Sequence, residues 1–265
     1  MSTEIGGERK AEGQGPESAG APQNGSGRPP SALRSQHSSS NQPAASTSRF
    51  LDFAASIWYS VLWGPCYAIS QVLFRYKFSG KSHVPATGPV LLVSNHQSHL
   101  DPVLIGIACP RQLKYLARVG LFFWPFSWWI RALGAVPIDR ESALTGIKTT
   151  IKLLKDGNAV VVFPEGSRTP DGFLHPLLPG FCVLARRSGA TIVPVAINGA
   201  FAALPRGAGY PRPARITLAF APKITKEQYG QLSDTALTEL VTERLRNAGC
   251  RMGADMGCDD VNGGN

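Results

Sequence analysis

Two side chains suited to acid–base chemistry follow directly on an apolar run. The run is PVLLV at residues 89–93, and the two side chains are His96 and Asp101 in the sequence SNHQSHLDP. Histidine has an ordinary pKa near neutrality, about 6.5, which suits a general base. A carboxylate hydrogen-bonded to one ring nitrogen leaves the other nitrogen free to take a proton. The pattern therefore predicts that His96 is a catalytic base and that Asp101 orients it.

The same residues also have structural interpretations. Asp101 followed by Pro102 is a good helix N-cap with proline at the first helical position. His96 and His99 are possible metal ligands, although no third ligand has a recognisable spacing. Five residues of an ideal helix turn through about 140°, so one regular helix does not place His96 and Asp101 on the same face. A catalytic pair therefore needs a bend between them, with Asp101 in the first helical turn.

Charged residues also follow two other short apolar runs. The run at residues 160–163 continues as PEGSR, and GAVPIDR at residues 134–140 ends in Asp139 and Arg140. The residues after the first run are Glu165, Gly166, Ser167 and Arg168. Glycine lets a ligand approach the backbone, and the arginine guanidinium matches the geometry of phosphate. Together these segments predict a pocket for an anionic group beside His96.

Short apolar runs alternate with helical patterns along most of the chain. Strands are expected at residues 89–93, 113–117, 133–138, 159–163, 191–197 and 215–220, and helices at 102–109, 144–154, 177–187 and from Ser233 onward. This alternation predicts an α/β fold, a single largely parallel twisted sheet flanked by helices. In such folds ligands bind beyond the carboxyl ends of the strands, where His96 and Glu165 are expected.

The first seventy or so residues of the chain differ from this middle part. Residues 1–49 are rich in Ser, Gly and Pro and contain no aromatic residue, so we expect a disordered arm. Residues 53–74 carry no charge over a length that is about enough to span a bilayer. Gly64-Pro65 interrupts this stretch, and its small and polar residues recur every three or four positions, which also fits a hairpin lying in the membrane interface. A helix packed on the protein's own core is a third interpretation.

Net charge and cysteine content leave several partners open. The formal net charge of +9 suits nucleic acid, an anionic membrane surface or a phosphorylated small molecule. The five cysteines are scattered without a CxxC pair, which favours reduced thiols over a disulfide framework or a zinc site. The aromatic run LFFWPFSWWI at residues 121–130 is either a core helix or a segment that dips into the membrane interface.

Four segments resemble, in order, the motifs of the glycerolipid acyltransferases, the family that includes 1-acylglycerol-3-phosphate O-acyltransferase (lysophosphatidic acid acyltransferase). NHQSHLD resembles the NHxxxxD motif, and GAVPIDR, FPEGSR and IVPVAI (residues 192–197) resemble the second, third and fourth motifs. The resemblance covers roughly residues 80–220. Ser167 stands where the family often has Thr, Leu178 stands where relatives often have Lys, and Pro137 is unusual in the second motif. These departures concern the substrate more than the reaction.

The resemblance implies a reaction and a set of site residues. His96 would take the proton from the free hydroxyl of a lysophospholipid, and that oxygen would attack the thioester of acyl-CoA or acyl-carrier protein. Asp101 would orient His96, no covalent acyl-enzyme would form, and no metal or organic cofactor would be needed. With lysophosphatidic acid as acceptor, the product would be phosphatidic acid. The residues expected to bind substrate are Asn95, Ser98, Arg140, Glu165, Gly166, Ser167 and Arg168.

The resemblance also implies an organisation and a location. We expect a disordered arm at 1–49, a membrane-associating helical segment at 50–79, the acyltransferase domain at 80–249 and a polar tail at 250–265. Membrane lipids would be partners, nucleic acid would not, and the catalytic domain would lie on the cytoplasmic side of the membrane. Glycerol 3-phosphate and lyso-ornithine lipid are alternative acceptors. A thioesterase or lipid hydrolase is less favoured, because the chain has no GxSxG motif and no Cys next to His96. A non-catalytic binder of anionic lipid or nucleic acid is also less favoured, because it would need neither the His96–Asp101 pair nor the two strand-end arginines.

Overall fold

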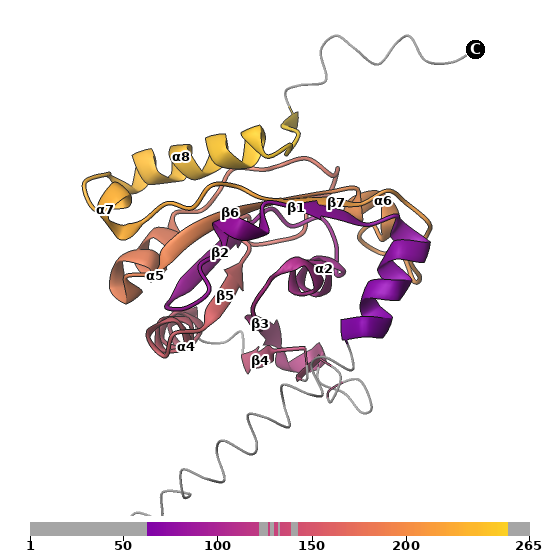
Figure 1. Ribbon diagram of the computed structural model, residues 1–265, viewed down its shortest axis with the longest axis horizontal. Helices are drawn as coiled ribbons and strands as arrows, with labels where there is room; N and C mark the ends of the chain where they lie inside the picture. Colours follow the sequence, from indigo (N-terminus) through magenta and orange to yellow (C-terminus); the bar gives the residue numbers. More distant parts are fainter. Residues whose placement is uncertain (1–62, 122–126, 128–129, 132, 139–142, 254–265) are drawn as a thin grey trace, which may run out of the picture. The chain divides into compact units, whose positions relative to one another are not determined.

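The sheet that carries the structure has seven strands in the order β1-β7-β6-β2-β5-β3-β4 (Figure 1). The computed structural model describes residues 63–121, 127, 130–131, 133–138 and 143–253. The strands are β1 (Lys77–Ser79), β2 (Val90–Ser94), β3 (Leu113–Arg118), β4 (Ala135–Ile138), β5 (Ala159–Val162), β6 (Thr191–Asn198) and β7 (Thr217–Phe220). Neighbouring strands are parallel except for β6 and β7, which are antiparallel. The predicted α/β fold with a largely parallel sheet is confirmed.

The central strand β2 explains why its sequence is continuously apolar. Both of its neighbours, β5 and β6, pair with it in parallel, and all five of its residues are buried. Val90 and Leu92 face one core, whereas Leu91 and Val93 face the other. A strand covered on both faces has no solvent side, so it needs apolar residues at every position. Polar side chains therefore first appear at Ser94, the last residue of β2, and in the turn that follows it.

Helices cover both faces of the sheet (Figure 1). On one face α2 (Asp101–Ala108) packs over the core that contains Val90, and residues 63–74 form a helix beside it. The Trp63 ring nitrogen donates to the Ile107 carbonyl at 3.0 Å, and the Tyr76 hydroxyl donates to the Leu104 carbonyl at 2.7 Å. The other face is covered by α4 (Ala143–Lys155), α5 (Gly180–Ser188) and α8 (Asp234–Asn247). Short elements complete the described chain: α6 (Ala200–Ala203), α7 (Lys226–Tyr229), and two 3-10 turns at Lys81–His83 and Val119–Leu121.

Several predictions fall partly or wholly outside the described residues. The arm at 1–49, residues 50–62 of the predicted membrane segment, and most of the aromatic run at 121–130 lie there. Within the described part of the chain, no helix combines the length and the apolar character needed to cross a membrane. At the other end, the packed structure continues past the predicted boundary at residue 249. Cys250 is buried and Met252 forms a β-bridge with Leu174.

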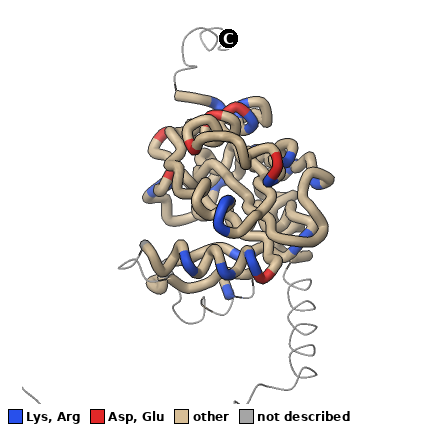
Figure 2. The backbone as a smooth tube through the Cα atoms, turned by 90° about the vertical axis from the view of Figure 1, so that its left-hand side faces the viewer, with Lys and Arg blue, Asp and Glu red and all other residues tan. Residues whose placement is uncertain are grey.

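Lysine side chains are exposed along α4, on the face of the sheet that α4, α5 and α8 cover. Lys148, Lys152 and Lys155 are exposed along α4, and Lys152 pairs with Asp156 at 2.7 Å. Figure 2 shows Lys and Arg positions in blue along this helix, which lies at the lower left of Figure 1 and faces the viewer in Figure 2. Part of the formal net charge of +9 is therefore exposed along α4.

Candidate active site

The turn after β2 brings His96 and Asp101 together. The strand ends at Ser94 and α2 begins at Asp101, so the bend between the two residues has the predicted place. His96 Nδ1 lies 2.8 Å from Asp101 Oδ2. The same oxygen accepts the backbone N–H groups of Gln97 at 2.6 Å and Ser98 at 2.7 Å. The turn therefore wraps around one carboxylate oxygen, which is held in place by three donors.

The environment of Asp101 determines what its carboxyl can do. The side chain is fully buried, and Oδ1 has no hydrogen-bond partner among the described residues. Burial raises the pKa of the Asp101 carboxyl, and the hydrogen bonds from His96, Ser98 and Gln97 oppose that rise. Because Oδ2 accepts three N–H groups, it carries no proton itself. Asp101 does not cap α2 with its side chain, so its carboxylate serves the preceding turn instead.

The His96 ring is fixed but reachable. Its side chain is 19 % exposed, and the ring stacks on Phe163 with centroids 4.0 Å apart and planes inclined by 20°. A carboxylate oxygen at Nδ1 requires that this nitrogen carries the proton, which leaves the lone pair on Nε2. His96 can therefore accept a proton at Nε2 from a group placed beside the turn. Asp101 would then stabilise the imidazolium that results.

The loop after β5 encloses the backbone of His96. Glu165 Oε1 accepts the His96 N–H at 2.7 Å, and Oε2 accepts the His175 N–H at 3.2 Å. The Thr169 N–H donates to the His96 carbonyl at 2.8 Å. Burial raises the pKa of the Glu165 carboxyl, against the effect of these two N–H groups. Both carboxylate oxygens are thus engaged by backbone donors, and Glu165 fixes the loop to the turn.

The remaining predicted residues of this loop lie at its tip. Gly166 has φ +73°, a left-handed conformation that glycine adopts without strain, and both Gly166 and Ser167 are exposed. Arg168 is half-buried. Arg140, the other predicted arginine, lies outside the described residues together with Asp139. The structure therefore brings the PEGSR segment to the His96 turn and leaves the place of Arg140 as a prediction.

Asn95 and Ser98 face the protein interior. The Asn95 amide exchanges two hydrogen bonds of 2.8 Å with the backbone of Ile197 in β6, and its residue is 1 % exposed. Ser98 Oγ donates to the Leu204 carbonyl at 2.9 Å and accepts the Leu100 N–H at 3.2 Å. We therefore assign both side chains to positioning the turn, because they have no exposed surface from which to make the predicted substrate contact.

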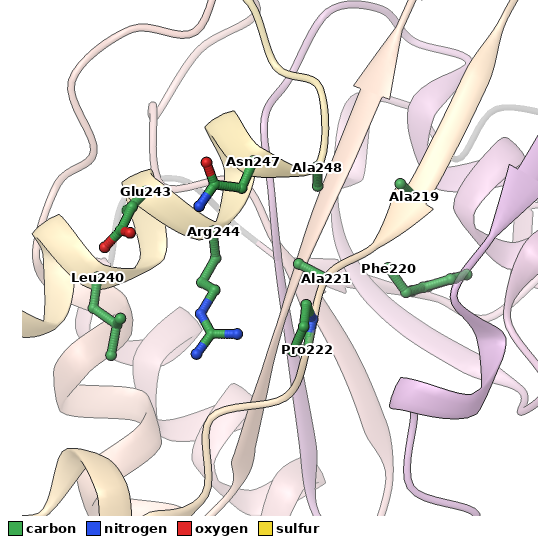
Figure 3. Close-up of a pocket in the computed structure, with 9 residues that line it drawn as sticks. All are labelled: Ala219, Phe220, Ala221, Pro222, Leu240, Glu243, Arg244, Asn247 and Ala248. Atoms are coloured by element: carbon green, nitrogen blue, oxygen red, sulfur yellow. The ribbon is translucent and has the colours of Figure 1, made fainter.

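Among the described residues, no group of three or more His, Cys, Asp or Glu side chains is arranged to hold a metal ion. A separate hollow lies between α8 and the end of β7, where Arg244 extends between Leu240 and Pro222 (Figure 3). This hollow contains none of the predicted site residues. The His96 turn and the loop after β5 are consequently the candidate active site.

Comparison with protein families identifies the site's relatives. Residues 75–198 match the family model described as Acyltransferase. The matched segment runs from β1 to the end of β6, and it includes the His96–Asp101 pair and the whole Glu165 loop. This segment of the chain resembles the acyltransferase family. The resemblance seen in its four motifs is confirmed.

Individual relatives carry informative names. The chain is 31% identical over 164 residues to the chloroplastic 1-acyl-sn-glycerol-3-phosphate acyltransferase of Arabidopsis thaliana, covering 60% of this chain and 44% of that protein. It is 35% identical over 127 residues to the 1-acyl-sn-glycerol-3-phosphate acyltransferase of Bacillus subtilis, covering 46% and 62%. The chain thus spans less than two thirds of the length of these relatives. The crystal structure of the 1-acyl-sn-glycerophosphate acyltransferase PlsC from Thermotoga maritima has the same fold, with a TM-score of 0.63, 24% identity, and coverage of 74% and 81%.

Two residues of the candidate active site had no role in the sequence prediction. Phe163 forms the surface on which His96 stacks, and Gln97 has its side chain buried between two loops. Phe163 reads in the sequence as the last residue of an apolar strand. Gln97 reads as an exposed polar residue of a turn, because nothing nearby in the sequence indicates the backbone groups that it binds.

Proposed function

We propose that the chain transfers an acyl chain from acyl-CoA or acyl-carrier protein to the free hydroxyl of 1-acyl-glycerol-3-phosphate, giving phosphatidic acid. The observation that carries the proposal is His96 Nδ1 held 2.8 Å from a buried Asp101 oxygen, at the carboxyl end of the central strand. The names of the relatives from Arabidopsis and Bacillus support the choice of acceptor. The donor and the acceptor are inferred from relatives that match this chain over only part of their length, so each is tested separately.

The proposed reaction needs one base and no covalent intermediate. Nε2 of His96 takes the proton of the acceptor hydroxyl while that oxygen attacks the thioester carbonyl. The tetrahedral intermediate collapses, the carbon–sulfur bond breaks, and the proton on His96 passes to the departing thiolate. The products are an ester and a free thiol. A thiol has an ordinary pKa of about 8.5 and leaves readily, so a base and good positioning suffice.

We assign the phosphate of the acceptor to the loop after β5. Gly166 and Ser167 are exposed at the tip of this loop, which is bound to the backbone of His96 on both sides of the tip. Arg168 follows at once and, with Arg140, would supply guanidinium groups for the phosphate oxygens. Glu165 would act indirectly, by holding the loop against the turn.

An acceptor panel tests the proposed function. Purified protein with membranes or detergent is given one labelled acyl-CoA and, separately, lysophosphatidic acid, glycerol 3-phosphate, lyso-ornithine lipid or lysophosphatidylcholine. We expect label in phosphatidic acid, with little label in free fatty acid. Preferred acylation of another acceptor would transfer the proposal to that acceptor, and label mainly in free fatty acid would favour a hydrolase. Repeating the preferred pair with acyl-carrier protein identifies the donor.

We also propose that the helix at residues 63–74 lies against the membrane interface. Ile69 is 58 % exposed and Val72 is 87 % exposed, and with Pro65 and Ala68 they occupy one helical face. The exposed cations Arg75, Lys77 and Lys81 follow, and they suit the anionic cytoplasmic leaflet. An apolar face followed by cations is the pattern of a helix that lies in the interface.

Vesicle binding tests this membrane contact. We expect the protein to co-sediment with vesicles that contain phosphatidylglycerol and to do so less with phosphatidylcholine alone. Val72→Asp should weaken the binding severalfold, whereas Val183→Asp, a matched change at a 42 % exposed valine on α5, should not. Equal binding by both variants would refute contact through this face.

A further inference from the structure

The side chain of Gln97 joins the turn after β2 to the loop after β5 and to the start of α6. Its Nε2 donates to the Gly172 carbonyl at 2.6 Å, in the loop that follows β5. Its Oε1 accepts the N–H groups of Ala200 at 3.1 Å and Phe201 at 3.4 Å, which begin α6 after β6. Gln97 itself lies in the turn after β2 and is 4 % exposed. One amide therefore ties the turn after β2 to the loop after β5 and to the start of α6.

The backbone of Gln97 has a different partner from its side chain. The Gln97 N–H donates to Asp101 Oδ2 at 2.6 Å, so the backbone helps to hold the carboxylate that orients His96. The side chain reaches the loop that carries Gly166, Ser167 and Arg168. A change in the side chain leaves the N–H in place. Substitution at this position can therefore loosen the loop while the His96–Asp101 pair stays supported.

The far side of the loop is tightly packed at the point that Gln97 holds. Gly172 has φ +89°, and a Cβ placed there would lie 3.1 Å from the ring of Phe201. The loop thus crosses the start of α6 with no space for a side chain between them. The first N–H groups of a helix lack partners within the helix, and Oε1 of Gln97 supplies one for α6. Gly172 and Phe201 are consequently fixed by the same amide.

From these contacts we infer that Gln97 is a positioning residue that sets the place of the phosphate-binding loop relative to His96, and so governs affinity for the phosphorylated acceptor. The inference rests on the proposed function, since that function assigns the acceptor phosphate to residues 166–168. The loop is bound to the turn by Glu165 and Thr169 near its start, and Gln97 holds its second half at Gly172.

Two substitutions separate the contacts of the amide. Gln97→Glu keeps an oxygen for the N–H groups of Ala200 and Phe201, but it places an acceptor against the Gly172 carbonyl. Gln97→Met removes both contacts. A matched control exists at Gln228, whose Oε1 accepts the Thr225 N–H at 2.8 Å and caps α7, another four-residue helix. Gln228→Glu and Gln228→Met make the same chemical changes at a helix that carries no predicted site residue.

Steady-state kinetics with lysophosphatidic acid and acyl-CoA provide the first test. We expect Gln97→Glu to raise the KM for lysophosphatidic acid about tenfold, equivalent to about 1.4 kcal/mol. The KM for acyl-CoA should stay within about twofold and kcat within about threefold, and the Gln228 variants should match the wild type. An unchanged acceptor KM in folded Gln97→Glu would overturn the inference. A fall in kcat with both KM values unchanged would overturn it as well, because that result places the effect on His96.

Hydrogen–deuterium exchange provides a second test that needs no activity. In Gln97→Glu we expect faster exchange in residues 171–175, and unchanged exchange at the N–H groups of Gln97 and Ser98. Equal exchange in residues 171–175 of the variant and the wild type would overturn the inference. If the wild type makes no phosphatidic acid, the proposed function fails, whereas this measurement still decides whether Gln97 holds the loop. Gln97→Glu alone is sufficient if Gln97→Met does not fold.

Discussion

Replacement of Asp101 by asparagine separates the charge of this residue from its shape. Asp101 Oδ2 accepts three N–H groups, and two of them belong to the backbone of Gln97 and Ser98. In Asp101→Asn the amide oxygen should take the place of Oδ2, because these backbone donors need an acceptor. The amide NH2 then takes the place of Oδ1, which has no hydrogen-bond partner among the described residues. The hydrogen bond to His96 Nδ1 is retained and only the negative charge is lost.

The loss of charge has a calculable effect on the rate. With the carboxylate and imidazolium charges about 4 Å apart and an effective dielectric constant of about 20, their attraction is about 4 kcal/mol. That attraction arises only when His96 has taken the proton, so it lowers the barrier of the acyl transfer. At about 1.4 kcal/mol per factor of ten, its removal should lower kcat about 10³-fold. The cost in stability should be about 1–3 kcal/mol, since the three hydrogen bonds to the side-chain oxygen persist while the new amide NH2 is buried without an acceptor.

The assay measures thiol release from acyl-CoA in the presence of lysophosphatidic acid, with urea unfolding alongside. Asp234→Asn is the matched control, because Asp234 pairs with Arg186 at 3.0 Å on α8 and α5, away from the turn. We expect the control to keep the wild-type kcat. A wild-type kcat in folded Asp101→Asn would refute the role of the Asp101 charge. A kcat loss matched by global unfolding would show instead that the residue is only structural.

Three further outcomes follow from the contacts of the site. Glu165→Gln should lower the unfolding free energy by about 1–3 kcal/mol in urea titrations, because one of the N–H groups of His96 and His175 then faces an amide NH2; a cost below about 0.5 kcal/mol would contradict this. Asn95→Leu should cost about 2–4 kcal/mol, since it leaves both backbone groups of Ile197 without partners, and a neutral effect would contradict the assigned role. Hydrogen bonds from Thr169 Oγ1 and Phe173 N lower the pKa of Asp171 from 3.8 to about 2, so its stabilising effect is complete above about pH 4 and is lost as pH falls towards 2. The wild type should therefore lose more unfolding free energy than Asp171→Asn between about pH 5 and pH 2, and parallel curves would contradict that assignment.

The strands that build the site were predictable because their physical situation is simple. β2, β5 and β6 are buried on both faces, so their sequences are continuous apolar runs that end where polar residues begin. Their observed ends differ from the predicted ones by one residue. The helix expected from residue 177 begins instead at Gly180, because Leu177 packs into the core as part of the preceding loop. Apolar residues thus showed where the segment packs into the core, but they did not show that its first residues form a loop before the helix begins.

Other features depend on contacts that a sequence pattern does not contain. β1 is three residues long, and it is held at the sheet edge by backbone pairing with β7. The antiparallel direction of β7 depends on how the chain returns from α6, and its apolar run is compatible with either direction. Asn95 was expected to bind substrate because the resemblance to the acyltransferases implies it. Its amide pairs with the backbone of Ile197, 102 residues away, a contact that the sequence pattern does not contain.

The most direct measurement of the central claim is the rate of acyl transfer to lysophosphatidic acid by His96→Gln. Glutamine keeps a polar side chain on the turn, and the backbone bonds of residue 96 to Glu165 and Thr169 remain. If His96 is the base, kcat should fall by about 10²–10⁴-fold while the urea midpoint stays close to that of the wild type. A folded His96→Gln protein that makes phosphatidic acid at the wild-type rate would contradict the account.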